Sequence, residues 1–310
     1  MLIYGAGMGG LLAANMLRRF KPEIREAQEK LPNNHSALLR FRTDNVGIAC
    51  GIPFNKVKVS KAISYDGKIY NDPSLDFSNQ YSEKVTGAIL ERSIHNLDNS
   101  ERFIAPLNLI ELMALNCNII YSKELEVITN TKESPMISTI PMPVMMEICG
   151  WENRPEFKYK TIWTQRGVIT EPDLNIYQTI YYPKKGLTWY RASIMGNVVT
   201  IEHSSEPEIN PGPAIMSILR EDFSIEARRI ESLESSTQKY GKILPIEENV
   251  RKEFIFHLTK EYNIYSLGRF ATWRQLLLDD VVNDVRVIEK FITTKDLYNI
   301  SLRNINPEDI

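Results

Sequence analysis

Three glycines near the start of the 310-residue chain, Gly5, Gly7 and Gly10, stand in G-x-G-x-x-G spacing. A short apolar run precedes them, and apolar residues on a helical period follow them. At such a strand-to-helix turn the first glycine permits the sharp bend, the second lets the backbone approach a pyrophosphate, and the third lets the helix pack on the strand. The amides at the helix start then face the phosphates. The spacing therefore predicts a dinucleotide site made by Gly5, Gly7, Met8, Gly9 and Gly10.

Glu26 follows the first glycine by about 20 residues and stands at the end of a polar second strand. An acidic side chain at this position can accept hydrogen bonds from both hydroxyls of an adenosine ribose. The alternative interpretation is that Glu26 is one more solvated charge in the run EIREAQEK. Strand, helix and second strand together form one βαβ unit, and this context favours the ribose interpretation.

The elements that must hold this site follow from periodicity. Helices are predicted over 74–96, 106–115, 213–232 and 247–262, and strands over 118–121 and 124–129. Residues 35–63 suit a loop followed by a hairpin, 136–148 a strand that runs into a proline-punctuated turn, 151–204 several antiparallel strands, and 264–292 a strand, a glycine turn and a long amphipathic helix.

The composition narrows the class of protein. The net charge is -2, from 37 basic and 39 acidic residues without long runs, so no nucleic-acid or membrane surface is indicated. The three cysteines form no C-x-x-C pair, which argues against a disulfide framework and a thiolate metal site. No stretch suits a leader or a membrane span. We expect a cytoplasmic protein without a metal, with a small-molecule substrate as its partner, and leave a homodimer open.

Three segments resemble signatures of the FAD-binding flavoenzymes that include the amine oxidases, protoporphyrinogen oxidases and UDP-galactopyranose mutases. They are GAGMGGLLAANML with REA, MISTIPMP, and YSLGRFATWRQLLLDD, and their order agrees with that class across most of the chain. The resemblance implies FAD as cofactor. It also implies an α/β fold of the glutathione-reductase type, in which a Rossmann-like FAD-binding domain carries a smaller, mainly antiparallel β substrate domain.

The last segment resembles the mutase branch most specifically, because there a strand ends in Gly-Arg and leads through an aromatic residue to an acidic one near a helix start. The resemblance implies cofactor contacts from Gly268, Arg269, Trp273, Leu278 and Asp279. The alternative interpretation of Arg269 is a surface or sheet-end arginine paired with an acidic neighbour. Most relatives also carry a glycine doublet and an arginine after the ribose acid. This chain has QEKLPNNHSALLRFR instead, where Arg40 and Arg42 are the candidates for that arginine and His35 for a place near the flavin.

The segment YYPKKGLTWYRASI is similar to the substrate-domain strands of these enzymes. We expect Arg191 to bind an anionic substrate group, since a guanidinium can hold a carboxylate or phosphate through two hydrogen bonds. Tyr182 and Trp189 are expected to line the substrate pocket. Packing of the sheet against helices is the alternative for each aromatic residue. The sequence assigns no catalytic residue.

These observations predict a FAD-dependent, amine oxidase-like oxidoreductase that oxidises a small polar substrate, an amine, amino acid or nucleotide-linked group, by hydride transfer to flavin. The alternatives are a mutase-like, non-redox flavoenzyme acting on a nucleotide sugar and a flavin-free binding module. Against the mutase stand Gln275, where that branch has a tyrosine, and a chain shorter than a typical mutase. The FAD-binding domain is expected to comprise residues 1–45, 103–145 and 238–310, and the substrate domain residues 46–102 and 146–237.

Overall fold

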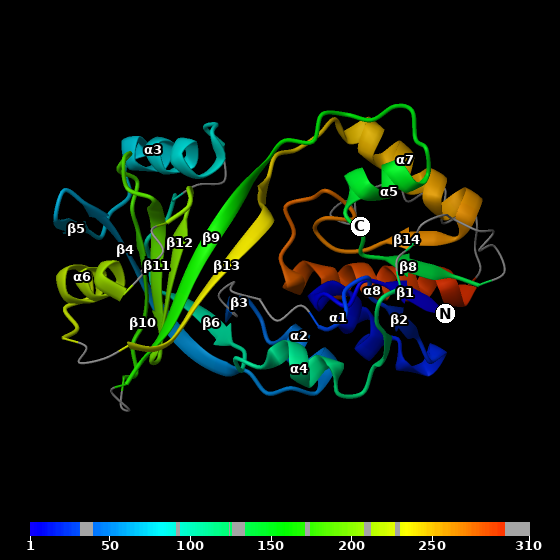
Figure 1. Cartoon of the computed structure of the whole chain (residues 1–310), viewed down its shortest axis with the longest axis horizontal. Helices are drawn as coiled ribbons and strands as arrows, with labels where there is room; N and C mark the ends of the chain where they lie inside the picture. Colours follow the sequence, from blue (N-terminus) through cyan, green and yellow to red (C-terminus); the bar gives the residue numbers. More distant parts are fainter. Residues whose placement is uncertain are drawn as a thin grey trace.

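The computed structural model describes residues 1–31, 40–90, 94–123, 125, 134–170, 174–207, 212–226 and 230–294. His35 and nearly all of the strand expected over 124–129 lie outside these ranges. The chain forms two lobes, one around a parallel sheet and one around a curled mixed sheet (Figure 1). No helix within the described ranges combines the length and the apolar character that crossing a membrane requires.

The parallel sheet has five strands among the described residues, in the order β14-β8-β1-β2-β7. Every neighbouring pair is parallel, so the carboxyl ends of the strands lie along one edge. The strands are β1 (Leu2–Tyr4), β2 (Glu23–Arg25), β7 (Asn118–Ile120), β8 (Met136–Ser138) and β14 (Ile264–Ser266).

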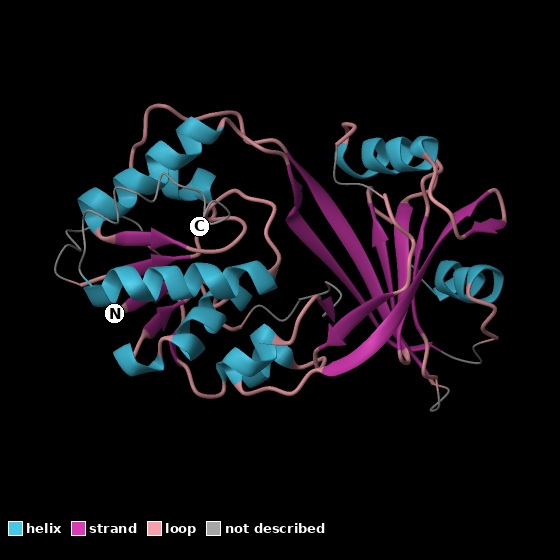
Figure 2. Ribbon diagram, turned by 180° about the vertical axis from the view of Figure 1, so that it is seen from behind, coloured by secondary structure: helices cyan, strands magenta, loops and turns pink. Residues whose placement is uncertain are grey.

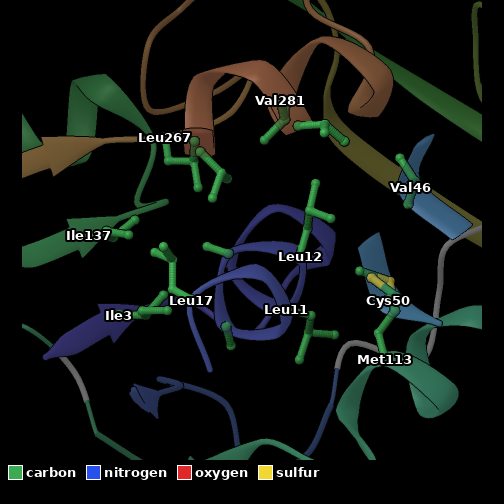
Figure 3. Close-up of a cluster of buried hydrophobic side chains, with 14 of the residues drawn as sticks. Ile3, Leu11, Leu12, Leu17, Val46, Cys50, Met113, Ile137, Leu267 and Val281 are labelled. Atoms are coloured by element: carbon green, nitrogen blue, oxygen red, sulfur yellow. The ribbon is translucent and has the colours of Figure 1, made fainter. Parts of the chain in front are cut away.

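Two buried clusters attach helices to this sheet. Figure 3 shows the larger cluster, in which Ile3 and Ile137 of the sheet meet Leu11 and Leu12. Burial of each such side chain stabilises the fold by about 1.5–3 kcal/mol. Side chains of this cluster pack four helices against the sheet: α1 (Met8–Met16), α2 (Asn45–Cys50), α4 (Leu109–Ala114) and α8 (Leu278–Thr294). A short 3-10 turn, Arg18–Phe20, follows α1. The second cluster recruits α5 (Met142–Ile148) and α7 (Glu248–Tyr262).

The curled sheet has nine strands within the described ranges, eight of them in the order β13-β9-β12-β11-β10-β4-β6-β3, with β5 paired to β4. Neighbours are antiparallel except β10 and β4, which are parallel. The strands are β3 (Arg40–Phe41), β4 (Asn55–Tyr65), β5 (Lys68–Tyr70), β6 (Ser100–Ile104), β9 (Tyr159–Ile169), β10 (Tyr177–Tyr181), β11 (Trp189–Met195), β12 (Val198–His203) and β13 (Ile230–Ile243). Separate buried clusters fix α3 (Leu75–Thr86) and α6 (Gly212–Asp222) to it (Figure 2).

Several predicted elements differ from the structure. The helix expected over 74–96 ends at Thr86, and the stretch expected as a loop and a hairpin over 35–63 contains the helix α2. The proline-punctuated turn after β8 is the helix α5, because Pro141 caps it and Pro143 lies in its first turn, where a missing N–H costs nothing. The helix expected over 213–232 ends at Asp222, and Ile230 already begins β13. Strand β13 runs past residue 238 and pairs with β9 as far as Ile243.

Candidate functional site

The first glycine turn links β1 to α1 at the carboxyl edge of the parallel sheet. Gly5 has a φ of +98°, which favours glycine, and a Cβ there would overlap the hydroxyl of Thr139. A Cβ at Gly10 would overlap the carbonyl oxygen of Gly5. The packing of α1 on the sheet therefore requires both of these glycines. A Cβ at Gly7, in contrast, would meet nothing within 4 Å.

The start of α1 is suited to an anion. Gly7 caps the helix without a side-chain hydrogen bond, and the first turn contains no acidic residue. The first amides of a helix lack intrahelical acceptors, and the helix dipole adds positive potential there. Open space beside Gly7 therefore coincides with a helix start that no side chain of its own neutralises.

Glu26 lies directly after β2, beside this turn, with 8% of its surface exposed. Its Oε2 accepts a hydrogen bond of 2.6 Å from the backbone N–H of Ala6, and its Oε1 accepts one of 3.0 Å from Gln28. The structure therefore excludes the interpretation of Glu26 as a solvated charge. The carboxylate is held against the glycine turn.

A second glycine turn follows β14 at the same edge. Gly268 has a φ of +87°, and a Cβ there would meet nothing within 4 Å. The next residue, Arg269, donates from Nη2 to the carbonyl oxygen of Gly241 at 3.3 Å, and its guanidinium lies over the ring of Phe270.

The side chain of Trp273, which was expected to contact the cofactor, is instead buried in the protein. Its side chain is 2% exposed, its Nε1 donates to the carbonyl oxygen of Leu244 at 2.9 Å, and its ring packs against Phe157 and Tyr240. This burial gives the indole a packing role that anchors the loop after β14, and leaves no face of it for a ligand.

The start of α8 is tied to the segment after β3. Asp279 accepts from the backbone N–H and the hydroxyl of Thr43 and from the N–H of Arg42. Arg42 therefore meets α8 through its backbone, while its side chain is exposed. Leu278 packs against the larger cluster of the parallel sheet. Asp279 thus positions the helix start rather than presenting a free carboxylate.

Arg40 belongs to the curled sheet and does not lie at the glycine turns. Its Nη1 donates to Oγ1 of Thr179 at 2.7 Å, and Thr179 shares a 2.9 Å hydrogen bond with Ser193. Burial and the nearby charges of Arg191 and Arg102 lower the pKa of Arg40 to about 10. The side chain of Arg40, which was expected to contact the cofactor, therefore lies against one face of the curled sheet.

The three residues expected to bind substrate lie on two faces of that sheet. Arg191 makes two hydrogen bonds to Glu202, one of them 2.7 Å from Nη2 to Oε1. Tyr182 lies on the other face under α6, where its hydroxyl donates to Asp222 at 3.0 Å, and the ring of Trp189 packs in the same cluster. Register explains the separation, since Tyr181 is the partner of Arg191 and Tyr182 points the opposite way. The structure therefore does not bring Tyr182 and Trp189 together with Arg191.

Sequence reasoning missed Thr43, Lys61, Arg102 and Glu202. Lys61 and Arg102 share the face of Arg40 and Arg191, but this depends on which strands pair. The only available signal was the alternation of lysine and apolar residues in KVKVSKAIS, which places one lysine on the side of Val57 and Val59.

No protein-family model matches the chain, and no curated protein matches it in sequence. Solved structures do resemble it. The structure of reduced UDP-galactopyranose mutase matches with a TM-score of 0.69 and 14% identity, over 96% of this chain and 94% of that one. PqsL, a probable FAD-dependent monooxygenase from Pseudomonas aeruginosa, matches with a TM-score of 0.55 and 11% identity, over 98% and 89% of the two chains. The flavin-dependent brominase Bmp2 matches with a TM-score of 0.54 and 10% identity, over 98% and 81%.

At such low identity the likeness shows the fold. The chain has the α/β fold of these flavoenzymes, with a parallel sheet and a curled, mainly antiparallel sheet, so the predicted fold class is confirmed at that level. The match to the mutase spans nearly all of both chains.

Proposed function

We propose that this chain is a FAD-dependent oxidoreductase that oxidises a small polar substrate by hydride transfer to flavin. The observation that carries the proposal is the open space at Gly7, beside the buried carboxylate of Glu26 and at the start of α1, where no side chain bonds to the first amides of the helix. Packing explains Gly5 and Gly10 but not Gly7. Close approach of a pyrophosphate to the backbone supplies the missing reason.

In this proposal the amides of Gly7, Met8 and Gly9 bind the pyrophosphate, and Glu26 accepts from the ribose hydroxyls. Arg269 and the backbone at Gly268 face the flavin end, because β1 and β14 flank β8 and their carboxyl ends share one edge. Bound FAD would supply the electron sink for the hydride. The chain's own residues orient the two reactants and exclude water.

The glutathione-reductase type of fold, the division into residues 1–45, 103–145 and 238–310 against 46–102 and 146–237, and a cytoplasmic location with a small-molecule partner belong to this proposal. A homodimer is compatible with it.

The test begins with the absorption spectrum of the purified protein. A yellow protein whose cofactor, released by heat, is identified as FAD supports the proposal. Anaerobic bleaching of the flavin is then screened with amines, amino acids and nucleotide derivatives, because a substrate that donates a hydride reduces the flavin without oxygen. A colourless protein that takes up no added FAD overturns the proposal and favours a flavin-free binding module.

A second candidate is a mutase-like reaction in which reduced flavin acts without net electron flow. The match to UDP-galactopyranose mutase over nearly the whole of both chains favours it. Gln275, where that branch has a tyrosine, speaks against it, because its side chain donates to the carbonyl oxygen of Ile243. Stoichiometry separates the two: an oxidoreductase consumes one electron acceptor per turnover, and a mutase consumes none.

A further inference from the structure

The register of the curled sheet places four cationic side chains on one face. Lys61 pairs with Thr179, which in turn pairs with Ser193. Arg191 stands two residues before Ser193 on β11, and Arg102 pairs with Val57, four residues before Lys61 on β4. Since side chains two or four residues apart share a face of a strand, Lys61, Arg102 and Arg191 point to the same side.

Arg40 joins them from the edge of the sheet. It pairs with Ile104 on β6, so β6 and β4 separate its strand from β10 in the sheet order. Its Nη1 nevertheless lies 2.7 Å from Oγ1 of Thr179 on β10. The sheet therefore curls enough to bring the guanidinium of Arg40 to β10. We call Arg40, Lys61, Arg102 and Arg191 the basic cluster.

The basic cluster has little internal neutralisation. Glu202 is the carboxylate that bonds to it, and both of its oxygens are engaged by Arg191. In the described part of the chain, Arg40, Lys61 and Arg102 form no ion pair. Asp98 acts on Lys61 only through its charge at longer range. Burial, followed by repulsion from Arg102 and Arg40, lowers the pKa of Lys61 below its ordinary value.

Glu101, the carboxylate beside Arg102 on β6, does not face the basic cluster. Glu101 alternates with Arg102 on β6, and it pairs with Lys56 on the outer side at 2.8 Å. Three half-buried cations on one face of the sheet, mutually repelling and without an ion-paired carboxylate among the described residues, favour binding of an oxyanion from outside the chain.

The basic cluster also adjoins the proposed cofactor site. Arg40 stands two residues before Arg42, whose N–H bonds to Asp279 at the start of α8. Two residues span at most about 7 Å. An anion held by Arg40 therefore lies near the junction of the curled sheet and α8.

We propose that the basic cluster is the anion subsite of the substrate, in which Arg40, Lys61 and Arg102 bind a phosphate or carboxylate group while the Arg191–Glu202 pair holds the floor of the subsite. The naming of this anion as part of the substrate rests on the proposed function. The binding of an oxyanion does not, because it follows from the curled sheet alone.

The test measures anion binding by titration calorimetry on the full chain, as purified with its cofactor, at constant ionic strength. The probes are inorganic pyrophosphate and succinate. We expect the double variant Lys61→Gln/Arg102→Gln to bind the preferred probe at least tenfold less tightly than the wild type. Each single variant should show a smaller loss of affinity in the same direction. Lys58→Gln is the matched control: it removes the same charge from the same strand, but from an exposed side chain on the outer face. It should bind within twofold of the wild type.

Preference for pyrophosphate identifies a phosphorylated substrate, and preference for succinate identifies a carboxylate. Absence of binding of both probes to the wild type, or equal weakening by Lys58→Gln, overturns the proposal. The cofactor content of each sample, read from its absorption, keeps the two proposals apart. A protein with FAD and no anion binding contradicts only the subsite, whereas anion binding without FAD contradicts only the proposed function.

Discussion

Asp279 accepts both the backbone N–H and the hydroxyl of Thr43 on one carboxylate oxygen, at 3.0 and 2.7 Å. The two residues are 236 positions apart in the sequence. The contact fixes the first turn of α8 to the segment that leaves β3, and so connects the helices of the parallel sheet with the edge of the curled sheet. The placement of Arg40 relative to the start of α8 depends on it.

We expect Asp279→Ala to lower the free energy of unfolding by about 1–3 kcal/mol, because the half-buried N–H and hydroxyl of Thr43 lose their acceptor. Asp279→Asn keeps an oxygen that can accept from Thr43, so its loss should be smaller. Urea unfolding monitored by circular dichroism measures both. Equal stability of the alanine variant and the wild type would show that water replaces the carboxylate without cost.

We expect the effects of substituting Arg191 and Glu202 on the free energy of unfolding to be coupled, because the two side chains form a buried ion pair. Burial alone would raise the pKa of Glu202, but the charge and hydrogen bonds of Arg191 outweigh it and hold that pKa below its usual value. Arg191→Gln leaves a buried carboxylate without its partner and should cost about 3 kcal/mol of stability. The double variant Arg191→Gln/Glu202→Gln removes the charge as well and should recover at least half of that loss. A double variant as unstable as the sum of the single ones would contradict the coupling.

Local patterns predicted the part of the fold that local chemistry determines. The glycine spacing and the apolar period were sufficient for β1, α1 and β2, because the interactions of this unit lie within one continuous short stretch at the start of the chain. Prolines were misread at α5, since a proline in the first helical turn and a proline in a turn have the same sequence signature. Strand β13 was missed, because IESLESSTQ is largely polar and partners from β9 stabilise it.

The site was predictable only where it lies within one βαβ unit. Glu26 bonds to Ala6 across the two strands of that unit, and its spacing revealed it. The face on which Arg191 lies depends instead on its register with Tyr181 and on the irregularity between Trp189 and Arg191 on β11. A shift of one residue exchanges the two faces of a strand, and no local pattern specifies the register of distant strands.

We expect protonation of His203 to lower the free energy of unfolding at acidic pH. Its Nδ1 lies 3.1 Å from the hydroxyl of Thr188, its ring is buried, and burial lowers its pKa to about 4. Between pH 6.5 and 4 the unfolded chain binds a proton that the folded chain does not, so the free energy of unfolding falls as the pH falls, by at most about 1.4 kcal/mol per pH unit. Denaturant unfolding at pH 7, 5.5 and 4.5 should show a steeper decline for the wild type than for His203→Gln. Parallel declines would assign the acid sensitivity to other groups.

Gly7 and Gly10 offer a matched pair of identical changes in one helix start. Gly10→Ala should lower the free energy of unfolding by about 1–3 kcal/mol, because its Cβ would overlap the carbonyl oxygen of Gly5. Gly7→Ala has open space and an ordinary φ of -69°, so its stability should change by less than about 1 kcal/mol. Its FAD content after reconstitution should nevertheless fall at least tenfold, since the new methyl group would occupy the approach of the pyrophosphate. Urea unfolding of the apoprotein and absorption per chain give the two readouts. A Gly7→Ala protein that retains its full FAD content would move the pyrophosphate away from α1.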